Sequence, residues 1–386
     1  MIELQNEYVH LIVTYKTYWQ LKDYGSTSQI GFDHTYEEYI NNLNLVWNEC
    51  NRVLHKGCRL CINIGDQFAR SVYYGRYKVI PIRTEIIKFC ETIGFDYMGA
   101  IIWQKVTTTN TSGGASIMGS FPYPRNGILK LDYEFILIFK KLGKGPEASS
   151  DAKELSSMTT EEWNTYFAGH WNFPGERQDK HIAMFPVELP SRLIKMFSFA
   201  GETVMDPFLG SGTTSLAAKK LHRNSVGFEI NDDFFPIIRN KLQSNQIDMF
   251  DQDEIIYQTR INTDTDYSED IAQLPYQFKD PVQFDKKKDP RELQFGSRIS
   301  NDKAIKKEYF KIKSILSPTT LSLDNGQTIK LVGIREIQAK HEEAIEFLKT
   351  MTKGKKVHLE YDQICKIAEN DALPCYLYLK NKTFIN

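Results

Sequence analysis

Long apolar runs are missing from this sequence. No stretch of its 386 residues approaches the roughly 18 consecutive apolar residues that define a membrane-spanning helix. The first residues, MIELQNEYVHLIVTYK, also lack the basic region, apolar run and small-residue cleavage site of a signal peptide. We therefore expect a cytoplasmic protein that has no membrane partner.

Cysteine is sparse, and charge of neither sign dominates. The six cysteines show no spacing typical of a disulfide framework. Cys58 and Cys61 form a C-x-x-C within the strand-like run RLCINIGD, where we expect core packing and no metal site. The net charge of −1 excludes a chain that is basic throughout, so contact with nucleic acid requires a local basic face.

The first 245 residues alternate short apolar runs with helical periodicity. The expected strands cover 9–14, 59–64, 97–103, 132–139, the region of 204, and 225–229. The expected helices cover 36–54, 83–93, 186–199, 214–221 and 234–242. Such alternation predicts an α/β fold with a parallel sheet covered by helices on both faces.

Three segments depart from this pattern. Residues 106–127 are rich in Thr, Ser, Gly and Pro, which predicts a long loop of the kind that is often functional. Residues 143–180 are irregular, with a short helix expected near 159–167. Residues 246–305 read as a linker that begins acidic and becomes basic, and residues 306–386 as a separate strand-rich segment.

One loop carries the strongest chemical signal. Between the strand at 204 and the helix at 214 stand the residues DPFLGSGTT, whose glycines allow a tight turn and close approach to a ligand. The following helix begins with free N–H groups that suit a polar or anionic ligand. Glu229 ends the next strand, where a carboxylate can accept hydrogen bonds from ribose hydroxyls.

This loop resembles the cofactor motif of the DNA amino-methyltransferases, which methylate N4 of cytosine or N6 of adenine. The resemblance extends over about residues 1–245 and includes the motif order of the beta class, together with VLHKGCRLCINIGD, IIWQK and HIAMFP. It implies a seven-stranded, mostly parallel sheet, S-adenosyl-L-methionine as cofactor and double-stranded DNA as substrate. It also implies a restriction–modification role with a cognate restriction endonuclease, and a target-recognition insert at about 106–180.

The same resemblance assigns cofactor residues. It places Asp206, Phe208, Gly210, Gly212 and Thr213 around the methionine moiety, with Pro207 and Ser211 in the same loop, and Glu229 on the ribose. It also places His181, Phe185 and Pro186 beside the cofactor.

The catalytic motif departs from the family. There the first strand ends in Ser-Pro-Pro-Tyr or Asp-Pro-Pro-Tyr, often followed by Trp, whereas this chain has Tyr15-Lys16-Thr17-Tyr18-Trp19. The family's Ser or Asp side chain and a proline-fixed carbonyl accept hydrogen bonds from the target amine, and the aromatic residue stacks on the flipped base. A charged Lys16 cannot accept a hydrogen bond, and Thr17 lacks the fixed φ of proline.

Two interpretations follow for Tyr15, Tyr18 and Trp19 as catalytic candidates. The chain methylates DNA with backbone carbonyls in place of the lost groups, or it is a catalytically impaired pseudoenzyme that still binds cofactor and DNA. The Tyr-Trp pair favours cytosine N4 as the target, with adenine N6 as the alternative.

The expected recognition segment combines basic and aromatic side chains. Lys105, Phe121, Tyr123 and Arg125 are the candidate DNA contacts, since basic groups suit phosphates. The alternative is a solvated surface loop.

The C-terminal segment reads as a small β-barrel. Asn325-Gly326 between alternating strands indicates a hairpin. The segment resembles an incomplete barrel of the staphylococcal-nuclease-like family, an OB-type fold. The family's Asp-Gly-Asp-Thr turn falls on residues 317–320, SPTT, and its strand arginine on Lys330. We therefore expect binding or docking without nuclease activity.

Overall fold

In the computed structural model the chain divides into two compact units, residues 1–299 and 300–386. It describes residues 1–15, 18–26, 28–69, 74–105, 119–175, 186–243, 254–260, 266–282, 297–298, 309–361, 372–379 and 383–385.

A seven-stranded sheet forms the centre of the first unit, with strand order β10-β9-β1-β3-β7-β6-β8. Six strands run parallel, and β7 runs antiparallel to both of its neighbours. The expected seven-stranded, mostly parallel sheet is thus confirmed, and β7 makes it mixed. The strands are β1 (Val9–Tyr15), β3 (Leu54–Ile64), β6 (Phe95–Lys105), β7 (Tyr133–Lys141), β8 (His170–Phe173), β9 (Thr203–Asp206) and β10 (Asn224–Gly227).

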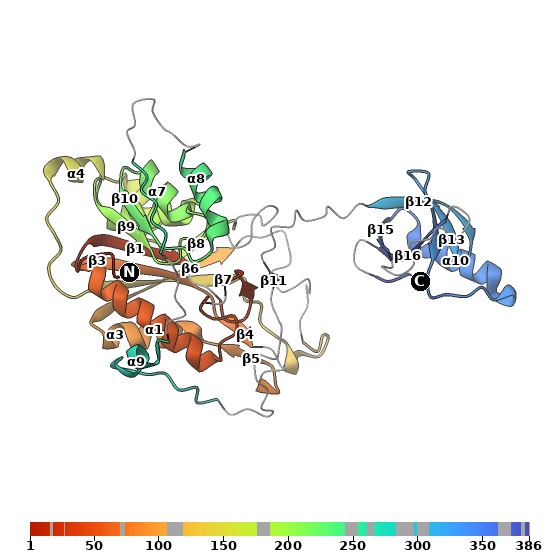
Figure 1. Ribbon diagram of the computed structural model, residues 1–386, viewed down its shortest axis with the longest axis horizontal. Coiled ribbons are helices and arrows are strands. Elements are labelled where there is room, and N and C mark those ends of the chain that lie inside the picture. Colours follow the sequence, from red (N-terminus) through yellow and green to blue (C-terminus); the bar gives the residue numbers. More distant parts are fainter. Residues whose placement is uncertain are drawn as a thin grey trace. The chain divides into compact units, whose positions relative to one another are not determined.

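Helices cover both faces of this sheet, as the alternating pattern predicts (Figure 1). One face packs on α1 (Tyr36–Val53) and α3 (Ile82–Thr92), and the other on α6 (Glu188–Phe197) and α7 (Thr213–Lys220). Cys58 and Cys61 pack on opposite faces of β3, since they belong to different apolar clusters. The C-x-x-C therefore does not present its two thiols to one ligand.

Smaller elements complete the first unit. They are the helices α4 (Ser150–Leu155), α5 (Thr160–Tyr166), α8 (Phe235–Gln243) and α9 (Ser268–Ala272), and the strands β2 (Lys22–Asp23), β4 (Gln67–Ala69), β5 (Lys78–Ile80) and β11 (Ser297–Arg298). The segment 143–180, expected to be irregular apart from one helix, also supplies α4 and the edge strand β8.

The region expected to be a linker packs on the first unit over residues 266–282. Leu274 and Phe278 are 8% and 3% exposed and join the core cluster of α1. Asn41 fixes this strap in both directions: its Nδ2 donates to the Phe278 carbonyl over 3.0 Å, and its Oδ1 accepts from the Phe278 N–H over 2.8 Å. Composition concealed this packing, because the segment is mostly polar and contributes only a few apolar residues to the core.

The second unit is a five-stranded closed barrel of order β12-β13-β14-β16-β15. Its strands are β12 (Phe310–Ser317), β13 (Thr320–Leu323), β14 (Thr328–Leu331), β15 (Lys356–Tyr361) and β16 (Ala372–Leu379), with α10 (His341–Thr352) between β14 and β15. The predicted hairpin joins β13 to β14, with Gly326 at φ 86°.

In the described part of the chain, no helix is both long and apolar enough to cross a membrane.

Candidate functional site

A glycine-rich loop joins β9 to α7 at the carboxyl edge of the sheet. Gly210 and Gly212 have φ of 54° and 80°, the left-handed region that favours glycine. A Cβ on Gly210 would meet no atom within 4 Å, whereas one on Gly212 would lie 3.3 Å from Ile238 of α8. The backbone at Gly210 therefore faces open space that a ligand can occupy.

Asp206 holds this loop from within. The carboxyl group is buried, with 1% exposure, and accepts hydrogen bonds from Thr14 Oγ1 (2.8 Å), Thr214 Oγ1 (2.7 Å) and the Phe208 N–H (3.0 Å). Burial raises the pKa of Asp206 to about 6, and these hydrogen bonds act in the opposite direction. Asp206 thus fixes the loop and does not line the open cleft beside it.

Glu229 reaches back to the same loop from the end of β10. Its Oε2 accepts from the Gly210 N–H over 2.8 Å, and its Oε1 accepts from the Asn231 N–H over 2.9 Å. Burial raises the pKa of this carboxyl group. Each carboxylate oxygen has a second lone pair, so Glu229 can also accept from hydroxyl groups of a ligand in the cleft that it lines.

Lys241 of α8 is a loop contact that the sequence analysis missed. Its ammonium group donates to Ser211 Oγ over 2.8 Å and to Thr213 Oγ1 over 3.1 Å. No motif marked this lysine, because its position depends on how α8 packs over the loop.

A cleft of 1960 Å³ runs along the loop. This volume exceeds the roughly 300–1,000 Å³ of common small-molecule sites, so a nucleoside-sized ligand fits. Pro186 is outside its lining. The residues that line it include Tyr15, Pro207, Phe208, Gly210, Ser211, Thr213 and Glu229.

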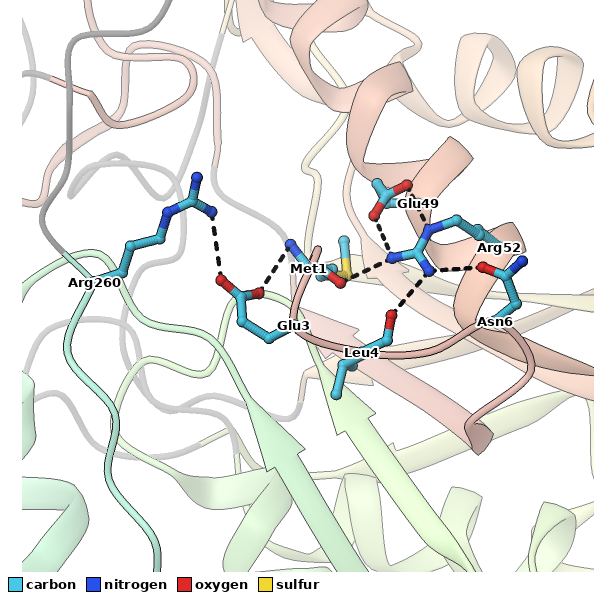
Figure 2. A network of polar contacts seen from close by, with 7 residues as sticks. All are labelled: Met1, Glu3, Leu4, Asn6, Glu49, Arg52 and Arg260. Atoms are coloured by element: carbon cyan, nitrogen blue, oxygen red, sulfur yellow. Dashed lines mark hydrogen bonds and ion pairs between the residues drawn. The ribbon is translucent and has the colours of Figure 1, made fainter.

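The N-terminal segment forms another part of the cleft wall and is held by Arg52 of α1 (Figure 2). The guanidinium donates to the carbonyls of Met1 and Leu4 over 2.8 and 2.9 Å. It also donates to Asn6 Oδ1 and pairs with Glu49, both over 2.8 Å. One arginine thus fixes the segment on α1.

Residues 254–260 contact both the N-terminal segment and α8. Arg260 forms an ion pair with Glu3 over 3.4 Å, as Figure 2 shows, and the Tyr257 ring lies 4.4 Å from that of Phe235. Part of the expected linker therefore lines the cleft.

Tyr15 and Tyr18 converge on a buried acid that the motif analysis did not identify. Glu134 of β7 is 4% exposed and accepts hydrogen bonds from both tyrosine hydroxyls, over 2.9 Å from Tyr15, and from Asn63 Nδ2 over 2.8 Å. The two hydroxyl oxygens are 3.0 Å apart. The available signal was a carboxylate inside the otherwise apolar strand EFILIF.

Trp19, a catalytic candidate, lies in the protein core. Its side chain is 1% exposed, its Nε1 donates to the His34 carbonyl over 2.8 Å, and its ring packs on Tyr36. This burial leaves the Trp19 ring no surface on which a base could stack, and a catalytic role for Trp19 stays a prediction.

The expected DNA-contacting residues whose side chains the structure describes lie at the surface. Phe121 and Tyr123 are 72% and 75% exposed, and Arg125 is exposed in the short 3-10 helix at Pro124–Asn126. Lys105 ends β6, and its side chain is outside the described part. His181, Phe185, Lys16 and Thr17 are also outside the described residues.

The chain matches known proteins over this unit. The DNA methylase family model, which groups N6 and N4 methyltransferases, matches residues 9–240. The type II methyltransferase M.MjaI of Methanocaldococcus jannaschii is 40% identical over 208 residues, which cover 52% of this chain and 66% of the relative. M.MthZI of Methanothermobacter thermautotrophicus is 34% identical, over 54% of this chain and 61% of the relative. The chain thus spans just under two thirds of each relative.

A solved structure agrees with these matches. A protein of Thermus thermophilus, described as a putative DNA modification methylase and crystallised with S-adenosyl-L-methionine, is 32% identical with a TM-score of 0.52. The similarity covers 63% of this chain and 88% of that one.

Proposed function

The chain belongs to the family of N6/N4 DNA methylases, and we propose that it transfers a methyl group from S-adenosyl-L-methionine to an exocyclic amine of a base in DNA, in a type II restriction–modification system. The observation that carries this proposal is the loop at Gly210, which faces an open cleft and is held by Asp206 and Glu229.

The described residues fit the cofactor. A Cβ at Gly210 would occupy open space beside the cleft, Phe208 offers an aromatic face, and Glu229 offers carboxylate oxygens to ribose hydroxyls. When bound, S-adenosyl-L-methionine supplies a methyl group on a positively charged sulfur. Tyr15 lines the same cleft from the end of β1, which places a candidate base contact beside the cofactor loop.

The proposal also includes the target base, the DNA contacts and the partner endonuclease. Cytosine N4 is favoured by the Tyr18-Trp19 pair and adenine N6 is the alternative, with Tyr18 stacking on the flipped base. Lys105, Phe121, Tyr123 and Arg125 contact double-stranded DNA, and His181 adjoins the cofactor. The protein acts in the cytoplasm, paired with a restriction endonuclease of the same specificity.

The decisive experiment is transfer of labelled methyl groups to mixed-sequence duplex DNA, with a calorimetric titration of the cofactor on the same sample. Cofactor binding with transfer supports the proposal, and nuclease digestion of the product identifies the methylated base. Failure to bind the cofactor would refute it.

A second candidate function is a pseudoenzyme that binds cofactor and DNA. The replacement of Ser-Pro-Pro by Tyr15-Lys16-Thr17 favours it. The triple variant Tyr15→Ser, Lys16→Pro, Thr17→Pro separates the two. If the wild-type protein is a pseudoenzyme, the triple variant methylates DNA much faster than wild type. If the wild-type protein is a working enzyme, the variant methylates DNA at the same rate or more slowly.

The C-terminal barrel serves in this proposal as an OB-type binding module without nuclease activity. The resemblance places an aspartate of the nuclease family at Thr319 in the β12–β13 turn, and the Thr319 hydroxyl donates to Glu336 over 3.0 Å. Cleavage of DNA that requires Ca²⁺ and is abolished by Lys330→Ala would refute this part.

A further inference from the structure

The reversed direction of β7 brings three side chains together at one edge of the sheet. Tyr15 and Asn63, which pair in the β1–β3 register, lie near the carboxyl ends of their strands. Glu134 is the second residue of β7, and because β7 runs antiparallel to β3, it lies at that same edge. The side chains of Tyr15 and Asn63 both donate to its carboxylate.

From this geometry we infer that Tyr15 replaces the missing serine as the acceptor for the target amine, and that Glu134 positions the Tyr15 hydroxyl and takes up its proton. The inference rests on the proposed methyltransferase function. Tyr15 is then a catalytic residue, and Glu134 is a positioning residue that acts through it.

The direction of the hydrogen bond suits this role. A tyrosine hydroxyl has one proton and oxygen lone pairs. The proton points to Glu134 over 2.9 Å, so the oxygen accepts from an amine that enters the cleft which Tyr15 lines. Burial, and next the Glu134 carboxylate, raise the pKa of Tyr15 well above its ordinary value, which keeps the hydroxyl protonated at neutral pH.

The proton balance closes without a further reactant. Methylation replaces one N–H bond of the amine by an N–C bond, while the C–S bond of the sulfonium donor breaks and leaves its electron pair on sulfur. The released proton passes to Tyr15 Oη as the Tyr15 proton passes to the Glu134 carboxylate. The resulting carboxylic acid returns this proton to water after the product leaves.

A purely structural role would not require a carboxylate here. Glu134 is 4% exposed in a strand whose following residues are apolar, and an isolated buried charge is costly unless hydrogen bonds satisfy it. Two tyrosines and Asn63 supply such bonds. The network therefore maintains a proton acceptor beside a cleft at a cost that simple packing would avoid.

The test compares Tyr15→Phe and Glu134→Gln with Tyr133→Phe as matched control, in single-turnover methyl transfer across pH. Tyr133 precedes Glu134 on β7, so its side chain points to the opposite face of the sheet, where it packs on Phe135. We expect losses of about 100-fold or more for the first two variants, the scale of general acid–base catalysis. Glu134→Asp, which keeps a carboxylate beside Tyr15, restores part of the rate.

A second readout does not depend on activity. In protein labelled with ¹³Cζ-tyrosine, the Tyr15 signal is assigned by its loss in Tyr15→Phe, and Glu134→Gln lowers the pKa of that hydroxyl toward its ordinary value. Tyr15→Phe keeps the ring, so it remains informative where Glu134→Gln fails to fold. An active wild-type protein whose Tyr15→Phe variant keeps its rate within twofold would overturn this inference alone. A wild-type protein that binds cofactor but methylates no DNA would overturn it together with the proposed activity.

Discussion

Thr14 Oγ1 donates a hydrogen bond to Asp206 Oδ1 over 2.8 Å, and so ties the end of β1 to the start of the glycine-rich loop. The two residues are far apart in sequence, yet the pairing of β1 with β9 brings them together. The strand that ends in Tyr15 and the loop that faces the cleft are therefore mechanically linked.

Thr14→Val should test this link. It removes a buried donor at nearly constant volume, and we expect a loss of about 1–3 kcal/mol in the free energy of unfolding and weaker cofactor binding. Urea denaturation and calorimetry measure these effects. Thr92→Val, which removes an exposed hydroxyl bonded to the Lys88 carbonyl, should change stability by less than about 0.5 kcal/mol and leave cofactor binding unchanged.

Gly210→Ala should separate backbone strain from ligand exclusion. The new Cβ meets no protein atom within 4 Å but enters space beside the cleft, so the fold survives while cofactor affinity falls at least tenfold. Gly201→Ala is the matched control, since Gly201 also has positive φ (82°) and an open Cβ position, and it does not line the cleft. Equal affinity losses in both variants would contradict a ligand at Gly210.

Glu229→Gln should weaken cofactor binding by roughly ten- to a hundredfold, the effect of losing a charged hydrogen-bond acceptor. The amide nitrogen of glutamine cannot accept from the Gly210 or Asn231 N–H groups. Asp233→Asn, at an exposed residue of the short 3-10 helix Asp232–Phe234, provides the control. Calorimetric titration that finds unchanged affinity in Glu229→Gln would exclude a direct role in binding.

Asp206 should make stability depend on pH. Burial raises its folded pKa from the ordinary 3.8 to about 6, so the folded state binds the proton more tightly than the unfolded state does. The contribution of Asp206 to the free energy of unfolding is greatest below about pH 4. It falls by on the order of 3 kcal/mol as pH rises to about 6. The unfolding free energy of wild type minus that of Asp206→Asn, measured from pH 4 to 7, should decrease as pH rises. A constant difference would contradict the shift.

Arg125→Ala should weaken DNA binding at all sequences and reduce the slope of log affinity against log salt by about 1, as expected for one phosphate contact. Fluorescence anisotropy at several salt concentrations measures both quantities. Lys153→Ala, an exposed charge on α4, should leave the slope unchanged. If Lys153→Ala lowers the slope as much as Arg125→Ala does, the effect is a nonspecific one of charge.

Local pattern was sufficient for the central elements and the cofactor loop. Apolar periodicity located β1, α1 and α7, and DPFLGSGTT located the loop, because each signal lies within one short segment. The number of strands was expected only from family resemblance, and the strand order was not predicted. The contacts of Glu134 with Tyr15 and of Lys241 with Ser211 escaped sequence analysis, because they depend on which strands and helices become neighbours in three dimensions.

The packing of Phe278 on Tyr36 determines where the first unit can be cut. A truncation after residue 245 would remove Leu274 and Phe278 and uncover the part of α1 around Tyr36, which favours aggregation during expression. A cut between 282 and 309 keeps these contacts. Residues 266–282 therefore belong with the first unit in any fragment prepared for crystallisation or for separate study of the barrel.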